Sequence, residues 1–415
     1  MESSFDLGTF AIIVGVAVLA PVIVQLPLRI GIPVVVAEIF LGIIIGQQGF
    51  ALAEQDGLIR FLSDLGLAFL FFIAGMELDF NRIRGRPLRL AGIGWVISCA
   101  LAFTVAAALQ ASGFVISGLL TGACLATTAL GALLPIMRDA DALESRFGAN
   151  VMAVGAVGEF GPIVLIALLL GGDSDTATSL ALLVGFVTLA VLAGVAARHM
   201  SPHTIASINR TMHRSAQLPV RLSILLLIVL VYLASQFGLD IILGAFSAGL
   251  IVGLIARGPE AEPLHVKFDA IGYGFLIPIF FITSGMEFDL DALFSSVSTF
   301  LRLPVFLALI LLCRGLPVFL LYRRKEDLER RDRWPLAFLS ATGLPLIVAI
   351  TQIGVETGRM RSATAAALVG AGMLSVFLYP LLALRIRGKG PELADVVPAD
   401  MALLPPTSAD APETA

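Results

Sequence analysis

A single carboxylate, Glu159, lies near the middle of an apolar stretch that covers residues 147–170. About 20 consecutive apolar residues suffice to cross a bilayer as a helix, so this stretch predicts a membrane span. A charged side chain at the bilayer centre costs at least about 2.5–3.5 kcal/mol on insertion scales, and such residues are retained mainly for function. The simplest ligands for a membrane carboxylate are a proton and a metal cation.

The composition extends this character to the whole chain. Of 415 residues, 58% are hydrophobic and only 14% are charged. These proportions predict an all-α polytopic membrane protein, with membrane lipid as its surroundings. The sequence contains no visible nucleotide loop, metal cluster or catalytic triad. We therefore expect neither an enzyme nor a bound cofactor, and no nucleic-acid partner.

Thirteen apolar segments are expected to span the membrane, and the loops between them alternate in charge. Most of the 27 basic residues fall in one set of loops, whereas the alternate loops are mostly acidic. The positive-inside rule then predicts a cell-membrane protein with its N-terminus outside and its C-terminus in the cytoplasm. The segments are residues 7–27, 30–48, 58–79, 88–110, 114–137, 147–171, 177–198, 218–236, 239–256, 268–288, 298–322, 334–354 and 361–384.

The chain also repeats itself. Residues 71–79 read FFIAGMELD, and residues 281–289 read FITSGMEFD. Gly42 recurs as Gly249 at a similar spacing. Because one odd helix separates two six-helix units, the second unit is predicted to be inverted. Inverted repeats are typical of secondary transporters, with the substrate site at mid-membrane between the repeats.

This repeat sets the expected domain organisation. The membrane transport domain covers residues 1–388, and a short polar tail, residues 389–415, is expected to be disordered and cytoplasmic. Within the membrane domain, the first repeat covers about residues 7–171, the linker helix residues 177–198, and the second repeat about residues 218–384.

Two repeat-related segments carry small and hydroxyl residues at matching depth. Thr127 and Thr128 lie at the centre of segment 114–137, and Thr342 lies at the centre of segment 334–354, with Gly and Pro nearby. This pattern predicts discontinuous helices whose freed carbonyls coordinate a cation. The alternative is ordinary close packing through small residues.

Other residues are predicted to support this site. Gly155 and Gly158 precede Glu159 and permit a close approach by another element. Arg314 cannot shed its proton, so it needs a partner, either Glu159 or the C-terminal end of a broken helix. The alternative for Arg314 is that it snorkels to the cytoplasmic face.

Two further carboxylates are weaker candidates for the site. Glu38 is either a structural partner of a helix end or a functional residue. Glu77 falls at the end of an expected helix, where a cap or interfacial solvation is the more common role.

In this order of features the chain resembles the monovalent cation/proton antiporters of the second cation–proton antiporter group, which includes the glutathione-gated potassium efflux proteins. The resemblance covers residues 5–388. It implies an essential carboxylate on the sixth of thirteen helices, unwound and crossing helices five and twelve, and a supporting basic residue on helix eleven. It also implies a homodimer with a dimerisation unit and a moving core unit. The residues that carry the resemblance are Pro33, Ala37, Glu38, Gly42, Gly46, Phe71, Phe72, Gly75, Met76, Glu77, Thr127, Thr128 and Glu159.

The chain departs from that family at two places. Electrogenic members have two adjacent aspartates on helix six and potassium-efflux members a Gln-Asp pair, whereas this chain has Gly158 and the single carboxylate Glu159. Only the polar tail follows the last segment, so gating through an attached nucleotide-binding domain is not expected. A separate cytoplasmic regulatory subunit stays open as a partner.

The sequence thus predicts a secondary antiporter that exchanges Na⁺ or K⁺ for H⁺, electroneutrally and by alternating access. Glu159 is predicted to bind the proton or the monovalent cation, with Thr127 and Thr128 as further ligands. The alternatives are a sodium-coupled symporter of related fold, a channel-like potassium efflux protein, and a sensor that has lost transport. The choice between sodium and potassium stays open, because both ions take oxygen ligands.

Overall fold

In the computed structural model every regular element of the described residues is a helix. Eight helical stretches among them are long and apolar enough to cross a membrane. The structure describes residues 6–25, 34–78, 83–139, 142–143, 145–170, 184–190, 192–195, 199, 211, 216–237, 239, 241–256, 262–294, 296–324 and 328–388.

The first half of the chain contributes α1 (Leu7–Gln25), α2 (Val34–Ile45), α3 (Gly57–Met76), α5 (Arg86–Ala111), α6 (Gly118–Leu125), α7 (Leu130–Asp139) and α8 (Arg146–Leu170). The second half contributes α11 (Leu218–Gln236), α12 (Ile241–Ile255), α13 (Glu262–Ile271), η1 (Gly272–Leu276), α14 (Ile277–Met286), α15 (Leu290–Phe294), α16 (Val297–Ile310), η2 (Leu311–Gly315), α17 (Leu316–Leu321), η3 (Arg330–Asp332), α18 (Arg333–Ser340), α19 (Pro345–Glu356) and α20 (Ser362–Arg387).

Twelve of the thirteen predicted segments coincide with these helices. Half of the remaining segment, residues 177–198, lies outside the described residues, and the tail after Gly388 lies wholly outside them. The count of thirteen and the inverted relation of the two repeats therefore stay predictions.

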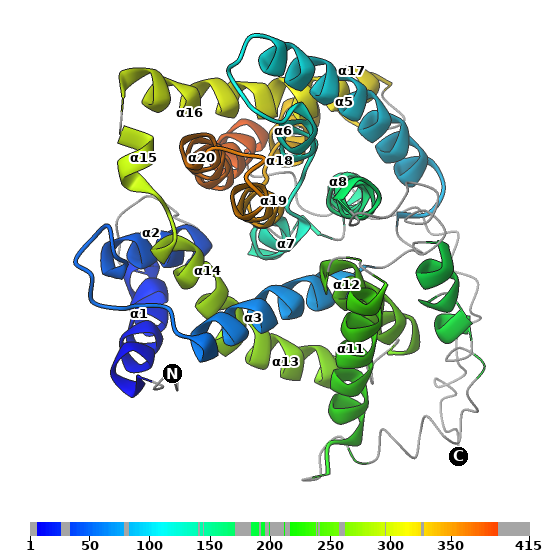
Figure 1. Cartoon of the computed structure of the whole chain (residues 1–415). Coiled ribbons are helices and arrows are strands. Elements are labelled where there is room, and N and C mark those ends of the chain that lie inside the picture. The colour runs from blue at the N-terminus through cyan, green and yellow to red at the C-terminus, as the bar shows by residue number, and fades with distance from the viewer. Residues whose placement is uncertain are drawn as a thin grey trace, which may run out of the picture.

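The helices pack as two groups. The first group, which we call the scaffold, comprises α1, α2, α3 and α11–α14, and the second, which we call the core, comprises α5–α8 and α16–α20. Figure 1 shows α7, α8, α19 and α20 close together, with α5, α16 and α17 outside them and α3 and α14 on the other side. Contacts within each group are far more extensive than contacts between the groups.

Glycines bring the scaffold helices into backbone contact at two equivalent places. A Cβ on Gly42 of α2 would fall within 3.0 Å of the Ile282 carbonyl of α14, and a Cβ on Gly249 of α12 would fall as close to the Phe72 carbonyl of α3. Gly42 and Gly249 are the glycines that the repeat matches in the sequence. Each of these contacts therefore joins a helix from one half of the chain to a helix from the other half, and the two contacts are reciprocal.

Two of the predicted spans are each broken into two short helices. Segment 114–137 forms α6 and α7, with residues 126–129 between them non-helical, and segment 334–354 forms α18 and α19. Ala126 follows α6 and Ala341 follows α18, so the breaks occur at the Ala-Thr pairs that the repeat aligns. At the second break, Pro345 begins α19 without a backbone N–H to continue the preceding helix.

Two further spans contain a turn of π-helix, η1 and η2, which the sequence analysis did not predict. Each π-helix is followed by a proline, Pro278 or Pro317, in the first turn of the next α-helix. Proline lacks the N–H that the preceding turn would use, and π-bulges relieve such a mismatch and often occur at functional sites. The second π-helix contains Arg314.

Candidate functional site

The site is built where the two broken helices meet α8. An unbroken helix would direct the N–H groups of Thr128, Ala129 and Leu130 to carbonyls four residues earlier. Instead, Thr128 donates to the Gly158 carbonyl of α8 at 2.9 Å, and Ala129 donates to the Thr342 carbonyl at 2.7 Å. We call this meeting of residues 126–130 with residues 341–344 the crossover. The N–H groups of Thr128 and Ala129 thus find acceptors outside their own span, which keeps the break stable in an apolar interior.

The third N–H group, that of Leu130, donates to the Glu159 side chain. The backbone N–H of Leu130, the first residue of α7, donates to Glu159 Oε2 at 3.1 Å, and the N–H of Gly131 also interacts with this carboxylate. The Glu159 side chain is 1% exposed. A helix N-terminus favours negative charge through its free N–H groups and its dipole, so α7 is oriented to hold the ionised form of Glu159.

Thr127, Thr128 and Thr342 are all buried at the crossover, but their hydroxyls form different numbers of hydrogen bonds. The Thr128 hydroxyl donates to the Ser340 carbonyl at 2.6 Å and accepts from Arg314 Nε at 2.7 Å. The Thr127 and Thr342 hydroxyls donate to the carbonyls of Cys124 and Phe338, earlier in their own spans, and accept no hydrogen bond from any other described residue. Thr128 thus links helices in this conformation, and Thr127 and Thr342 have the freer oxygens.

Arg314 is 0% exposed, so it does not snorkel to either face. Besides Thr128, its guanidinium donates from Nη2 to the Val154 carbonyl of α8 at 2.8 Å. Within the part of the chain that the structure describes, no carboxylate lies within ion-pair distance of Arg314, and Glu159 is not its partner. The Arg314 guanidinium therefore contacts neither of the two partners that were expected for it, a carboxylate or a helix end. It bonds instead to a threonine hydroxyl and to a carbonyl within a helix.

The other predicted residues lie at different distances from the crossover. Gly155 leaves room for the Leu130 side chain, since a Cβ there would be 2.8 Å from Leu130 Cδ1. Glu77 is the C-cap of α3 and is near enough to Glu159 for the two carboxylates to repel each other. Glu38 is buried on α2, which packs against α1 and α14. Within the described part of the chain, no hydrogen bond or ion pair connects Glu38 to the crossover.

Sequence reasoning missed two serines that hold the second break. The Ser340 carbonyl accepts the Thr128 hydroxyl, and Ser375 on α20 accepts the N–H of Gly343 at 3.1 Å. The Ser375 hydroxyl also lies 3.2 Å from the Gly343 carbonyl. Isolated hydroxyls within apolar spans were the available signal, but serine is common at helix contacts in membranes and gives little specificity.

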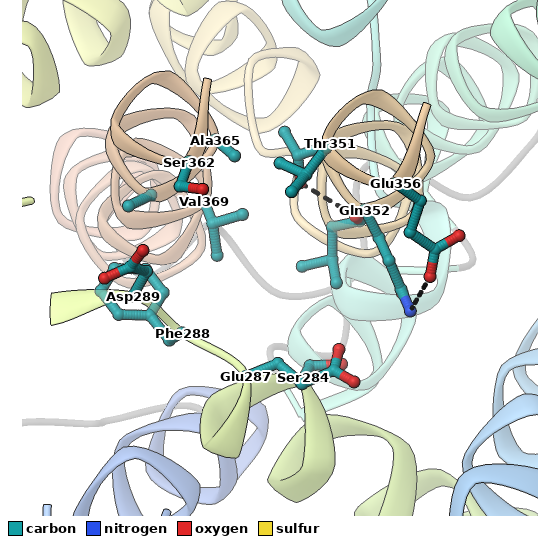
Figure 2. Close-up of a pocket in the computed structure, with 13 residues that line it drawn as sticks. Ser284, Glu287, Phe288, Asp289, Thr351, Gln352, Glu356, Ser362, Ala365 and Val369 are labelled. Carbon is teal, nitrogen blue, oxygen red and sulfur yellow. Dashed lines mark hydrogen bonds between the residues drawn. The ribbon is translucent and has the colours of Figure 1, made fainter. Parts of the chain in front are cut away.

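A cavity of about 280 Å³ lies between the scaffold and the core, where α14 and α19 end and α20 begins (Figure 2). Carboxylate, hydroxyl and amide groups line it alongside apolar side chains. Its residues are Ser284, Glu287, Phe288, Asp289, Val348, Thr351, Gln352, Val355, Glu356, Ser362, Ala365, Ala366 and Val369.

One ion pair joins the scaffold to the core beside this cavity. Arg60 of α3 lies 3.0 Å from the carboxylate of Glu356 at the end of α19, and both side chains are more than half exposed. Glu287, which lines the cavity, is also within the field of Arg60. Burial raises the pKa of Glu287 above its usual value, and the positive charge of Arg60 opposes this rise.

The chain matches a known family over most of its length. The model of the family described as "Sodium/hydrogen exchanger, transmembrane" matches residues 14–384. A curated relative, the "Putative Na(+)/H(+) antiporter YjbQ" of Bacillus subtilis, is 29% identical over 394 residues. That match covers 91% of this chain but 62% of the relative, so the chain spans less than two thirds of that protein's length.

Another relative and a solved structure agree with this match. The "Na(+)/H(+)-K(+) antiporter GerN" of Bacillus cereus is 25% identical over 295 residues, which cover 68% of this chain and 72% of the relative. The sodium proton antiporter MjNhaP1 of Methanocaldococcus jannaschii superposes with a TM-score of 0.61 at 18% identity. The superposition covers 92% of this chain and 99% of that one, which shows a shared fold.

Proposed function

Because the chain belongs to the sodium/hydrogen exchanger family, whose members are multi-pass membrane transporters, we propose that it exchanges a monovalent cation for a proton across the cell membrane. The cation is Na⁺ or K⁺. Relatives named as Na(+)/H(+) antiporters support sodium, and the name of GerN adds potassium as a substrate class.

The observation that carries this proposal is the placement of Glu159. Its carboxylate is buried at the break between two half-helices and accepts an N–H from the first residue of α7. A carboxylate in this position can take a proton, or it can share a cation with nearby hydroxyl and carbonyl oxygens. Thr127 and Thr342 supply such oxygens, which are the hard ligands that alkali cations require.

Exchange follows if Glu159 holds one ion at a time. The proton and the cation compete for the same carboxylate, so loading one displaces the other. One positive charge then crosses in each direction, which makes the cycle electroneutral. The core would carry the occupied site past the scaffold, because the contacts between these two groups are the sparser ones.

The cavity beside Glu287 and Glu356 fits the entrance on one side of this cycle. Val348 and Thr351 of α19 line the cavity, and α19 begins at the second break, so this helix leads from the entrance to the crossover. Its carboxylates attract cations to the opening. With the N-terminus outside, as the loop charges predict, this entrance faces the exterior. We further propose that the protein works as a homodimer.

The test is proton movement in proteoliposomes that contain the purified protein and a pH-sensitive dye. Sodium, potassium or lithium is added in turn to wild type and to Glu159→Gln. We expect at least one cation to release protons through the wild type, and the variant to lose this flux, because a neutral amide binds neither ion. Flux that persists in Glu159→Gln would overturn the assignment of this residue.

The same assay separates the alternative functions. A sodium-coupled symporter moves no protons against the cation, and a channel passes the cation with a membrane current. Measuring flux with the membrane potential clamped by valinomycin and potassium tests electroneutrality, since an electroneutral exchanger keeps its rate at every clamped potential. A rate that changes with potential would contradict the single-carboxylate mechanism.

A further inference from the structure

The space beside Gly158 is filled by one side chain from the first break and one from the second π-helix. A Cβ built on Gly158 would fall within 3.0 Å of Arg314 Nη2, of Thr128 Oγ1 and of Thr128 Cβ. Real Cβ atoms essentially never approach other atoms this closely. Even an alanine at position 158 would therefore have to push the guanidinium or the threonine away.

Gly158 also contributes its backbone to the same contact. Its carbonyl accepts the N–H of Thr128 at 2.9 Å, one of the bonds that replaces the helical pattern at the first break. The threonine is thus held from three directions, by Gly158, by Arg314 and by Ser340. Two residues further along the chain, Leu130 donates to Glu159.

The guanidinium is placed by these contacts rather than by a counter-ion. Among the residues that the structure describes, Arg314 forms no ion pair, and its guanidinium donates to Thr128 and to the Val154 carbonyl. Val154 lies one turn before Gly158 on α8, so the guanidinium lies along α8 over the position where residue 158 has no side chain. A fork-shaped group can reach both partners only if that position is empty.

We propose that Gly158 is a positioning residue of the ion site: by carrying no side chain it seats the Arg314 guanidinium and the Thr128 hydroxyl against α8, and it thereby fixes the crossover relative to Glu159. This inference rests on the proposed exchange at Glu159. This role differs from general helix packing, because the groups that occupy the space beside Gly158, the Arg314 guanidinium and the Thr128 hydroxyl, are bonded to the broken helices.

A second glycine on the same face of α8 provides a matched control. Gly161 lies three residues after Gly158, and a Cβ there would collide equally closely with the ring of Trp95 on α5. Gly158→Ala and Gly161→Ala therefore create the same kind of overpacking on the same helix. Only the first of them displaces atoms bonded to the crossover.

The experiment measures the apparent cation KM of exchange in proteoliposomes for wild type, Gly158→Ala, Gly161→Ala, Arg314→Lys and the double variant Gly158→Ala/Arg314→Lys. We expect Gly158→Ala to raise the KM about 10-fold or more, in line with the usual cost of overpacking a filled site. Gly161→Ala should keep the wild-type KM. The KM of the double variant should be no higher than that of Arg314→Lys alone, because the contact between the guanidinium and Thr128 is already lost in that variant.

Cation-dependent thermal stabilisation of the purified variants reports binding independently of turnover. Gly158→Ala should need a higher cation concentration for the same stabilisation. A wild-type KM in Gly158→Ala, or effects of Gly158→Ala and Arg314→Lys that multiply in the double variant, would overturn the proposal for Gly158. Wild-type protein that shows neither exchange nor cation stabilisation would instead overturn the proposed function.

Discussion

At the scale of single residues, hydroxyl groups hold together the region where the two helices break. The Thr128 hydroxyl links α18 to the second π-helix, and the Ser375 hydroxyl of α20 holds Gly343. Each of these groups satisfies backbone atoms that the breaks would leave exposed to an apolar interior. Leaving a buried polar group unsatisfied costs about 1–3 kcal/mol, which is large against the net stability of a folded protein.

Ser375→Ala should therefore destabilise the protein by about 1–3 kcal/mol, because the N–H of Gly343 then loses its acceptor. Ser223→Ala is the matched control, since Ser223 is also a buried serine but bonds only to Pro219 within its own helix. We expect a change of less than about 0.5 kcal/mol there. Thermal unfolding in detergent measures both, and equal effects would contradict the role given to Ser375.

We expect cation entry through the cavity to depend on pH because of Glu287. Burial raises the pKa of this carboxyl, so as the pH falls from neutral Glu287 is protonated earlier than an ordinary glutamate. The cavity then loses negative charge, and the cation KM measured from the cavity side should increase. Glu287→Gln should show a smaller increase over the same pH interval, whereas Glu54→Gln, an exposed acid outside the cavity, should match wild type. Identical pH dependence in wild type and Glu287→Gln would contradict this.

The residues at the crossover could be predicted only where the chemistry was unusual. A carboxylate in an apolar span is rare, so Glu159 could be proposed as the ion-binding residue from its position in the sequence alone. The engagement of Thr128 by Arg314 could not be predicted, because it depends on the relative rotation of three helices. Glu159 was one of two candidate partners for Arg314, whereas the guanidinium bonds to a hydroxyl and a carbonyl.

At the scale of elements, backbone contact through glycine organises the scaffold. A Cβ on Gly75 of α3 would fall within 3.0 Å of the Phe246 carbonyl of α12, and Gly249 makes the reciprocal contact with α3. Small residues allow this approach, which dispersion forces and close packing then stabilise in the absence of a hydrophobic driving force within lipid.

Gly75→Ala should lower the stability by about 1–3 kcal/mol, because the backbone of α12 cannot move aside as a flexible side chain can. Gly92→Ala in α5 provides the control. No atom lies within 4 Å of the Cβ position at Gly92, so alanine should be neutral or stabilising there by up to about 1 kcal/mol. Thermal unfolding of both variants measures the difference, and a stable Gly75→Ala protein would contradict the close contact.

The positions of the helices were largely predictable, because long runs of apolar residues predict membrane-spanning helices. The breaks at 126–129 and 341–344 were also predicted, since Thr, Gly and Pro recur there in both halves. The π-helices before Pro278 and Pro317 were not predicted. A proline in an apolar run is compatible with a kink, a π-turn or a break, and only the packing of neighbouring helices selects one of these.

At the scale of the whole molecule, the boundary between the scaffold and the core is where movement is expected. The contacts across it are sparse, and an exposed ion pair, Arg60 with Glu356, bridges it beside the cavity. Exposed pairs contribute about 0–1 kcal/mol, so this pair can break at little cost when the core moves.

Replacing both members of this pair by cysteine gives a test of that movement. In Arg60→Cys/Glu356→Cys, a bifunctional thiol reagent that bridges the two positions should stop exchange if the core must slide past α3. Cleaving the bridge with a reductant should restore the flux. Each single cysteine variant treated with the reagent serves as the control. Unchanged flux in the bridged protein would contradict relative movement at this boundary.

The glycine contacts of the scaffold also determine where the molecule can be deformed. Backbones that already touch cannot be compressed further, since protein interiors are as densely packed as organic crystals. The cavity between α14 and α19, by contrast, contains space that can shrink or widen. We therefore expect a change in lateral pressure or bilayer thickness to deform this cavity more readily than the glycine contacts, so that membrane tension would act on the proposed entrance before it acts on the proposed ion site.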